Sequence, residues 1–464
     1  MNPHCLLSNP RPEPRTGTEG IDPQLVARAL CQLGHVRRLD RLGLRCPLDA
    51  SAGRKSDYAC LFGRDSLRMA LDLLDDFPVV ARTTIARLTA LQGIGVNARA
   101  EEEPGRILHE YRCDGNLHAA RLGELWGFPY YGSVDATPLY AILIGAYCER
   151  YGRSLLQARV RDRAGALVTI RDGLERALWW INSRLARDGY ICVQRAQPHG
   201  LNNQTWEDSY DSHFQGNGRL LDVDIPYAPA AAQGLAYDAL LVGAELEQDG
   251  RRASYLRVLA AMLRRRVMAE FWLPSLHTFA PALVLDCTGP KPTRIVASSP
   301  GHLLDTRLLD GVDAGPRREA LICRLLAPDM LAAAGIRTKS TTARRFRPGS
   351  YHNGSVWPMD TGVIADGLRR HGHVREADDL EDRILRACAV AGSPVEFFRG
   401  DQDGTIAINT RSVYVRQDGE SRRVEQPPQR IQGWTATRLW RILRSRGALS
   451  EVNTLPVQIA DVAA

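Results

Sequence analysis

Apolar residues recur at helical spacing along most of the 464-residue chain. Asp22-Pro23 opens the first such segment, with an aspartate at the cap position and a proline in the first turn. Strand patterns are few and short, at residues 189–195 and 280–285. The same helical signature predicts further helices over residues 65–75, 80–93, 137–151, 165–188, 229–247, 252–271, 315–327, 359–371, 374–391 and 433–445.

About a dozen helices joined by loops of unequal length are typical of successive helical hairpins, so the pattern predicts an all-α fold. We expect one domain over residues 21–445, a mobile N-terminal tail over 1–20 and a peripheral C-terminal segment over 446–464. Residues 272–300 are irregular but keep apolar side chains, and we interpret them as an elaborated loop of that domain.

The composition narrows the possible functions. Apolar residues make up 44% of the chain, which favours a globular fold. The net charge of +7 is carried almost entirely by arginine, since lysine occurs only at Lys55, Lys291 and Lys339. Basic clusters are short and interspersed with acidic residues, so we expect no nucleic-acid partner. No run of about 18 apolar residues is present, and we expect no membrane span.

The ten cysteines are scattered and form no C-x-x-C pair, which argues against zinc ribbons and thioredoxin-like sites. Cys31, Cys148, Cys323 and Cys388 lie within apolar helical runs and are interpreted as small buried hydrophobes. Together with an N-terminus that lacks an apolar signal-peptide core, this usage predicts a reducing, cytoplasmic location.

Five clusters combine carboxylates, aromatics and glycines at expected helix–loop junctions. A sugar site needs this mixture, because aromatics stack on the ring faces and polar side chains satisfy the hydroxyls. Hydrolysis further requires two carboxyl groups that flank the scissile bond. No phosphate-binding glycine loop is present. The clusters lie at residues 62–66, 130–137, 203–211, 351–360 and 394–398, the last followed by 432–434.

Each cluster alone also has a simpler explanation. Asp65 and Asp135 are placed to cap helices, and Trp206 and Trp357 are acceptable core aromatics. His352 and Asn353 are residues that could serve a turn. Five clusters of one composition nevertheless favour a carbohydrate site.

The motifs FGRDSL, EEPGRILHE, YYGSVDATPLY, GLNNQTWEDSYD, SSPGHLL, GIRT and YHNGSVWPMDTG resemble the bacterial amylo-α-1,6-glucosidase or glycogen-debranching group. That group is similar, more distantly, to the family 63 processing α-glucosidases, trehalases and glucoamylases. The motifs span about residues 58–442 in the family's order. The resemblance implies an (α/α)6 barrel and an inverting hydrolase that uses neither metal nor other cofactor.

The resemblance also assigns roles. Asp208 of WEDS is the implied acid, and its pKa is expected to be raised by burial and by neighbours such as Glu207 and Asp211. Glu396 of PVEFF is the implied base, although one residue is inserted after the proline, and Glu425 is the rival. The expected substrate-binding residues are Arg64, Asp65, Tyr131, Asp135, Gln204, Trp206, Asp211, His352, Asn353, Trp357, Asp360 and Trp434.

Two departures from the family bear on the substrate. No β-sandwich precedes FGRD, and Glu207 replaces a lysine that is frequent in the W-K-D-S motif. We therefore expect a carbohydrate substrate, as for an α-glucosidase acting on a small glycoside, an oligosaccharide or an α-1,6 branch. A sucrose- or trehalose-type hydrolase, a phosphorylase on the same barrel, and a catalytically silent carbohydrate-binding protein are the alternatives.

Overall fold

The computed structural model describes residues 21–33, 48–53, 58–112, 120, 122–417 and 420–449. The predicted tail at 1–20 lies outside the described residues, as does the predicted C-terminal segment beyond residue 449.

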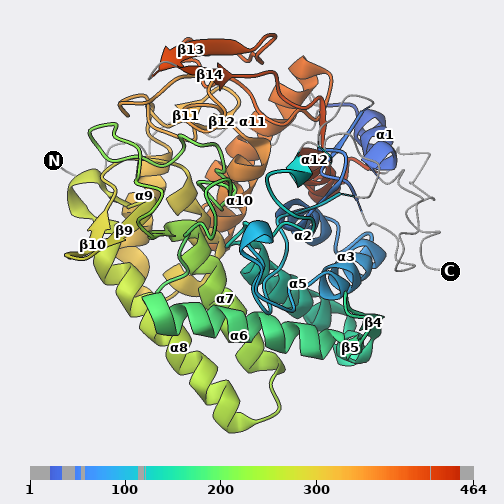
Figure 1. Ribbon diagram of the computed structural model, residues 1–464. Helices are drawn as coiled ribbons and strands as arrows, with labels where there is room; N and C mark the ends of the chain where they lie inside the picture. The colour runs from blue at the N-terminus through green and yellow to red at the C-terminus, as the bar shows by residue number, and fades with distance from the viewer. Residues whose placement is uncertain are drawn as a thin grey trace.

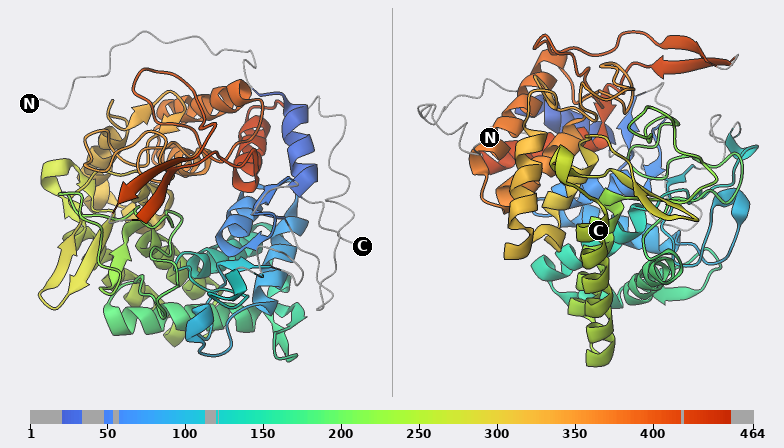
Figure 2. Two further views of the ribbon diagram at one scale, coloured as in Figure 1. Left: turned by 45° about the horizontal axis from the view of Figure 1, so that its top comes forward. Right: turned by 90° about the vertical axis from the view of Figure 1, so that its left-hand side faces the viewer.

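Helical hairpins form two concentric rings, and the chain runs once around them in sequence order (Figures 1 and 2). Each inner element packs on the next, and the last returns to the first, so the ring closes. The predicted (α/α)6 barrel is therefore confirmed. The inner ring comprises α2 (Gly63–Asp72), α5 (Ala136–Tyr151), α7 (Ala230–Leu246), the 3-10 helix η4 (Ser299–Asp305), α10 (Pro358–Arg370) and α12 (Gly433–Ser445). The outer ring comprises α1 (Pro23–Leu33), α3 (Pro78–Ala90), α6 (Ile170–Asp188), α8 (Gly250–Glu270), α9 (Gly315–Leu325) and α11 (Val374–Ala391).

Helix boundaries follow local signals closely. The predictions for 374–391 and 433–445 match α11 and α12 at both ends. The predicted helix 165–188 begins late, at Ile170, because Thr169 and Asp172 form a capping box and residues 167–169 pair as a strand. α6 then ends at Gly189, which adopts the left-handed conformation that favours glycine.

One predicted strand is absent from the described part of the chain, and one short helix was missed. Residues 189–195 form no strand and contribute one isolated bridge, Val193 to Tyr227. Residues 299–305 were not predicted as helical, yet they occupy one position of the inner ring as the short helix η4. Its first turn contains a proline and a glycine, which hide the helical pattern from sequence.

Short strands decorate the loops. The strand predicted at 280–285 corresponds to β9 (Ala282–Asp286), the centre of an antiparallel sheet ordered β10-β9-β6, with β6 at Tyr227–Pro229 and β10 at Gly289–Pro292. A hairpin of β13 (Val413–Gln417) and β14 (Glu420–Glu425) crosses in front of the ring in the left view of Figure 2. The other two- and three-residue strands are β1 (Ser51–Ala52), β2 (Leu61–Phe62), β3 (Glu110–Tyr111), β4 (Arg159–Arg161), β5 (Leu167–Thr169), β7 (Trp272–Leu273), β8 (Thr278–Phe279), β11 (Leu331–Ala332), β12 (Gly335–Ile336) and β15 (Ile431–Gln432).

One continuous hydrophobic core fills the space around and between the rings and contains Trp180, Trp357 and Trp440. Of the four cysteines expected to be buried, Cys148 and Cys388 are buried, Cys31 is half-buried and Cys323 is exposed, so the prediction was wrong for Cys323. Among the residues that the structure describes, no helix has the length and apolar character to cross a membrane.

The inner helices present their N-terminal ends on one side of the barrel. α2, α10 and α12 begin immediately beside residues of the polar and aromatic clusters identified above. Gly63 is needed for this placement, because a Cβ atom there would clash with the Leu108 carbonyl oxygen. The geometry therefore gathers polar first-turn side chains at one mouth of the barrel.

Candidate active site

A pocket opens at this mouth of the barrel. Its walls come from the first turns of α2 and α12, from the loops that precede α7, α10 and α12, and from residues next to β1 and β2. It is lined by Ala50, Tyr58, Phe62, Arg64, Asp65, Trp206, Asp208, Tyr351, His352, Trp357, Glu396, Gln432 and Trp434.

Asp208 lies at the pocket wall with 29% of its side chain exposed. Burial raises the pKa of this carboxyl to about 7, the Arg64 charge opposes that shift, and Asp135 adds to it. Glu110 acts in the same direction. The expected contribution of Glu207 is not among these causes, because the Glu207 charge is paired with Lys339.

Glu396 is 2% exposed and lines the same pocket. Burial raises the pKa of its carboxyl to about 7, although two donors stabilise the ionised form. The Tyr351 hydroxyl donates to Oε1 at 2.5 Å, and the Gln429 backbone N–H donates to Oε2 at 2.9 Å. Asp65 and Asp208 raise this pKa further through like charge, so the carboxyl groups of the pocket act on one another.

The rival Glu425 is placed differently. It ends β14 and does not line the pocket. Its carboxylate lies 3.0 Å from Arg399 and 3.7 Å from Arg347, with 12% of the side chain exposed. Glu425 is therefore a largely buried ion-pair partner outside the pocket.

Arg64 connects two acidic residues of the site, Asp135 and Asp208. Its Nε donates to Asp135 at 2.8 Å, and its Nη1 lies 3.9 Å from Asp208. Asp65, which follows it, is 5% exposed, and burial raises the pKa of its carboxyl to about 7. Neither aspartate serves as a helix cap through its side chain, because the cap residue of α2 is Phe62 and Asp135 makes no capping bond at α5.

The tautomer of His352 follows from its contacts. Burial lowers the pKa of this imidazole well below 6.5, and the Lys339 charge lowers it further, so the ring is neutral. Its Nδ1 accepts the Ser209 backbone N–H at 3.3 Å. The ring proton therefore sits on Nε2. This nitrogen is then a buried hydrogen-bond donor that has no protein partner among the described residues.

Several other buried polar atoms of pocket residues share this property within the described part of the chain. They are Arg64 Nη2, Trp206 Nε1, Trp434 Nε1 and Gln432 Oε1. Buried polar atoms in proteins are normally hydrogen-bonded, and clusters of exceptions require an explanation. Donors in excess of acceptors around two carboxyl groups suit a ligand rich in hydroxyl oxygens.

Six residues expected to bind substrate do not line the pocket. Asp135 binds Arg64, and Asp360 lies 2.7 Å from His302. The Asn353 side chain donates to the Asp211 backbone carbonyl at 3.0 Å. Asp211 itself lies 3.7 Å from Arg345.

The other two are placed deeper in the protein. Gln204 accepts from Arg106 at 2.6 Å, and Tyr131 donates to the Leu91 carbonyl at 2.6 Å. Both side chains are fully buried. None of the six residues, Tyr131, Asp135, Gln204, Asp211, Asn353 and Asp360, lines the pocket, and their role in substrate binding stays a prediction.

Five lining residues were missed. Phe62, Tyr351 and Gln432 stand inside or beside the clusters recognised from sequence, and their polar or aromatic character was the available signal. Ala50 and Tyr58 precede the FGRD cluster and carry no such signal. The pairing of β1 with β15 brings this segment to the pocket, which only the tertiary structure reveals.

Arginines gather where the pocket meets the β13–β14 hairpin. The Arg422 guanidinium lies 5.2 Å from the centre of the Tyr210 ring, two residues beyond Asp208. The charge of Arg423 acts on the Tyr58 hydroxyl, whose pKa is raised by burial and by Glu396 and Asp208. Arg422 and Arg423 therefore lie near the pocket, while the carboxyl groups of Asp65, Asp208 and Glu396 line the pocket itself.

Comparison with known proteins identifies a glycoside hydrolase domain in this chain. Residues 147–403 match the model of the mannosylglycerate hydrolase MGH1-like glycoside hydrolase domain. A search of curated proteins found no match. The amylo-α-1,6-glucosidase specificity suggested by the motifs is not confirmed, while the prediction of a glycosidase is.

Solved structures share the fold at low sequence identity. A family 63 mannosylglycerate hydrolase from Thermus thermophilus, in complex with Tris and D-glycerate, aligns with a TM-score of 0.57 and 13% identity over 92% of this chain and 100% of the other. The complex of such a hydrolase from the same organism with glucose aligns with a TM-score of 0.54 and 15% identity over 90% and 99%. On the family match and the shared barrel, this chain belongs to the MGH1-like glycoside hydrolase domain family.

Proposed function

We propose that the chain hydrolyses small α-glycosides with inversion at the anomeric carbon, using Asp208 as the acid and Glu396 as the base. The observation that carries this proposal is that two carboxyl groups with raised pKa values, the partly exposed Asp208 and the buried Glu396, line one pocket. Burial keeps a carboxylic acid protonated near neutral pH, which a proton donor requires.

In this mechanism Asp208 protonates the glycosidic oxygen as the bond to the anomeric carbon breaks. Glu396, ionised, removes a proton from a water that attacks the opposite face of the ring. Tyr351 and the Gln429 N–H hold both Glu396 oxygens, so the base has a fixed orientation. We expect the two carboxyl groups to stand ~6.5–9.5 Å apart, which leaves space for that water.

The buried donors of the pocket support binding of the glycone. His352 Nε2–H, Trp206 Nε1–H and Arg64 Nη2 would each find an acceptor in a sugar hydroxyl. Asp65 and Gln432 Oε1 would accept from hydroxyl protons, and Trp434 supplies an apolar wall. A site built from such groups rejects analogues that leave them unpaired.

For the leaving group we propose a small carboxylate such as glycerate. The arginines Arg422 and Arg423 near the pocket support this choice, because arginine pairs well with carboxylates. One structural relative is described with D-glycerate bound. A carboxylate beyond the scissile bond would therefore meet opposite charge.

The test is a release assay on mannosylglycerate, glucosylglycerate, the corresponding glycosylglycerols, maltose, isomaltose, trehalose, sucrose and limit dextrin. We expect the glycerate glycosides to exceed the matched glycerol glycosides by at least about tenfold in kcat/KM, since a charged hydrogen bond contributes about 1.5–3 kcal/mol. Arg422→Gln should lower this ratio, whereas Arg416→Gln, an exposed arginine on the same hairpin, should not.

Other outcomes would select the alternatives. Faster turnover of limit dextrin or isomaltose would favour a debranching specificity, and preference for sucrose or trehalose would favour those hydrolases. Dependence on phosphate, with a sugar phosphate as product, would indicate a phosphorylase. Binding of these sugars without turnover of any of them would indicate a catalytically silent carbohydrate-binding protein.

A further inference from the structure

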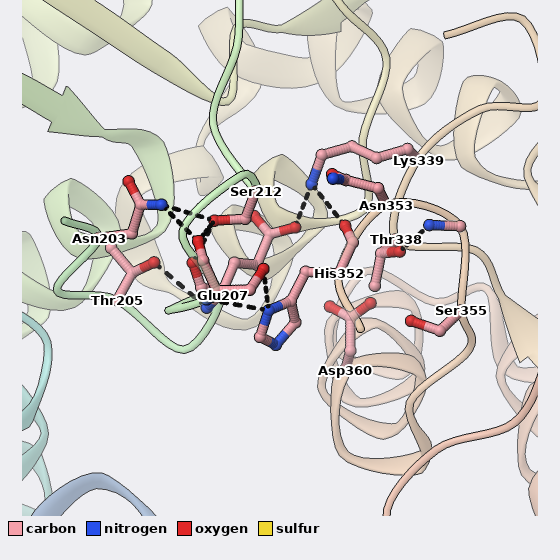
Figure 3. Close-up of polar contacts among 12 residues, drawn as sticks. Asn203, Thr205, Glu207, Ser212, Thr338, Lys339, His352, Asn353, Ser355 and Asp360 are labelled. Atoms are coloured by element: carbon pink, nitrogen blue, oxygen red, sulfur yellow. Dashed lines mark hydrogen bonds and ion pairs between the residues drawn. The ribbon is translucent and has the colours of Figure 1, made fainter. Parts of the chain in front are cut away.

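Lys339 is one of three lysines in a chain that otherwise uses arginine for positive charge. Its side chain is 1% exposed, and its backbone pairs with Ala297 in an isolated bridge. Figure 3 shows its ammonium between the loop that carries Glu207 and the loop that carries His352. A lysine retained and buried at such a junction requires an explanation.

The ammonium joins the two loops directly. It donates to Glu207 Oε1, whose side chain is also 1% exposed, and to the His352 backbone carbonyl at 3.2 Å (Figure 3). Glu207 immediately precedes Asp208, and His352 lines the pocket. The compact ammonium points its donors at two acceptors in different directions, which the planar guanidinium of arginine does less readily.

The loop around Glu207 transmits this restraint to its neighbour. The Ser212 hydroxyl donates to the Glu207 carbonyl at 2.5 Å, and the Asn203 amide donates to the Ser209 carbonyl at 2.6 Å. Tyr227 in turn donates to Asn203 at 2.8 Å. Because Asp208 lies inside this bonded turn, a shift of Glu207 moves Asp208 with it.

Charge provides a second link between the same groups. Burial lowers the pKa of His352 most, and the Lys339, His213 and Arg64 charges lower it further. The neutral ring is the form whose Nδ1 accepts the Ser209 N–H, one residue beyond Asp208. Lys339 thus acts on both sides of the turn that carries Asp208, through Glu207 and through His352.

We propose that the buried Lys339–Glu207 ion pair positions the Asp208 carboxyl so that it can protonate the leaving-group oxygen. This inference rests on the proposed role of Asp208 as the acid. Neither residue touches the substrate. Their removal disturbs proton donation and leaves the attack by water at Glu396 intact.

The experiment exploits the leaving group. Hydrolysis of methyl α-glucoside and methyl α-mannoside needs an acid, because the leaving methoxide must be protonated. The 2,4-dinitrophenyl α-glycosides of the same sugars need none, because dinitrophenolate departs without a proton. The variants are Glu207→Gln, Lys339→Met and the double variant, which removes both charges. The double variant is included because a single change leaves a buried unpaired charge, while loss of both partners is often neutral for stability.

We expect the double variant to fold and to lose about 10²-fold on the methyl glycosides, the usual cost of misplacing a catalytic group by about 1 Å, with less than about threefold loss on the dinitrophenyl glycosides. Glu207→Gln should show the same selectivity. Lys291→Met is the matched control, because Lys291 also forms an ion pair, with Asp286 at 2.6 Å, but is exposed and lies on the β9–β10 hairpin.

The result that overturns the inference is a double variant whose ratio of methyl to dinitrophenyl activity equals that of the wild type, since a purely structural ion pair changes both activities together. Asp208→Asn, measured on the same pairs, separates this failure from failure of the proposed function. If Asp208→Asn also leaves the ratio unchanged, Asp208 is not the acid and the proposed function falls.

Discussion

Replacing Glu396 with glutamine should abolish hydrolysis, and the stability of the variant relative to the wild type should rise with pH. The ionised carboxylate is 2% exposed, and its pKa is raised from the ordinary 4.5 to about 7, chiefly by burial. A carboxyl whose pKa is raised in the folded state favours folding only while it is protonated. Its contribution is therefore lost as pH rises from about 4.5 through about 7.

The magnitude follows from that shift. Between pH 5 and pH 8, a carboxyl with pKa values of 4.5 unfolded and about 7 folded reduces the free energy of unfolding by about 2.5 kcal/mol. Glutamine lacks this titration. It also keeps only one acceptor for the two donors, the Tyr351 hydroxyl and the Gln429 N–H, at a cost of about 1–3 kcal/mol that does not vary with pH.

Urea unfolding of the wild type and Glu396→Gln at pH 5, 6, 7 and 8 measures the difference directly. We expect the variant to be less stable than the wild type at pH 5 and to gain about 2.5 kcal/mol on it by pH 8. Release of sugar from the natural substrate should fall to background in the same preparations. A stability difference that is constant over this range would refute the argument that burial raises this pKa.

Three further predictions concern the reaction. Asp208→Asn should lower kcat on unactivated glycosides about 10²–10⁴-fold with little change in the thermal midpoint, and near-normal turnover would remove Asp208 from its role. Glu425→Gln should retain most activity in the same assay, because Glu425 is paired with Arg399 outside the pocket. If the Glu425→Gln variant is inactive and the Glu396→Gln variant is active, Glu425 is the base and Glu396 is not. The pH profile of kcat/KM should be bell-shaped around pH 7, since the base must be ionised and the acid protonated while both carboxyl pKa values lie at about 7; a flat profile from pH 5 to 9 would contradict these assignments.

The sequence by itself determined the helices and the barrel. The apolar period of three to four residues is a local property, and capping residues such as Thr169 and the terminal Gly189 stop it at defined points. The exception is η4, where a proline and a glycine replace the helical pattern and only packing against α7 and α10 fixes the element.

The sequence also placed the polar clusters in order, and Arg64, Asp208, His352 and Glu396 do line one pocket. It did not decide which clustered residues face that pocket. A loop side chain takes its direction from partners far along the chain, which local patterns do not encode.

Contacts between residues far apart in the sequence determine which of these side chains line the pocket. Asp135 accepts a hydrogen bond from Arg64, 71 residues away, and so holds a pocket residue without lining the pocket itself. Glu207 meets Lys339 across 132 residues, which gives a substitution within the WEDS motif its compensating charge. Glu396 and Glu425 are similar candidates in sequence, yet one is buried in the pocket and the other is paired with arginines, because burial and charge pairing are properties of the folded chain.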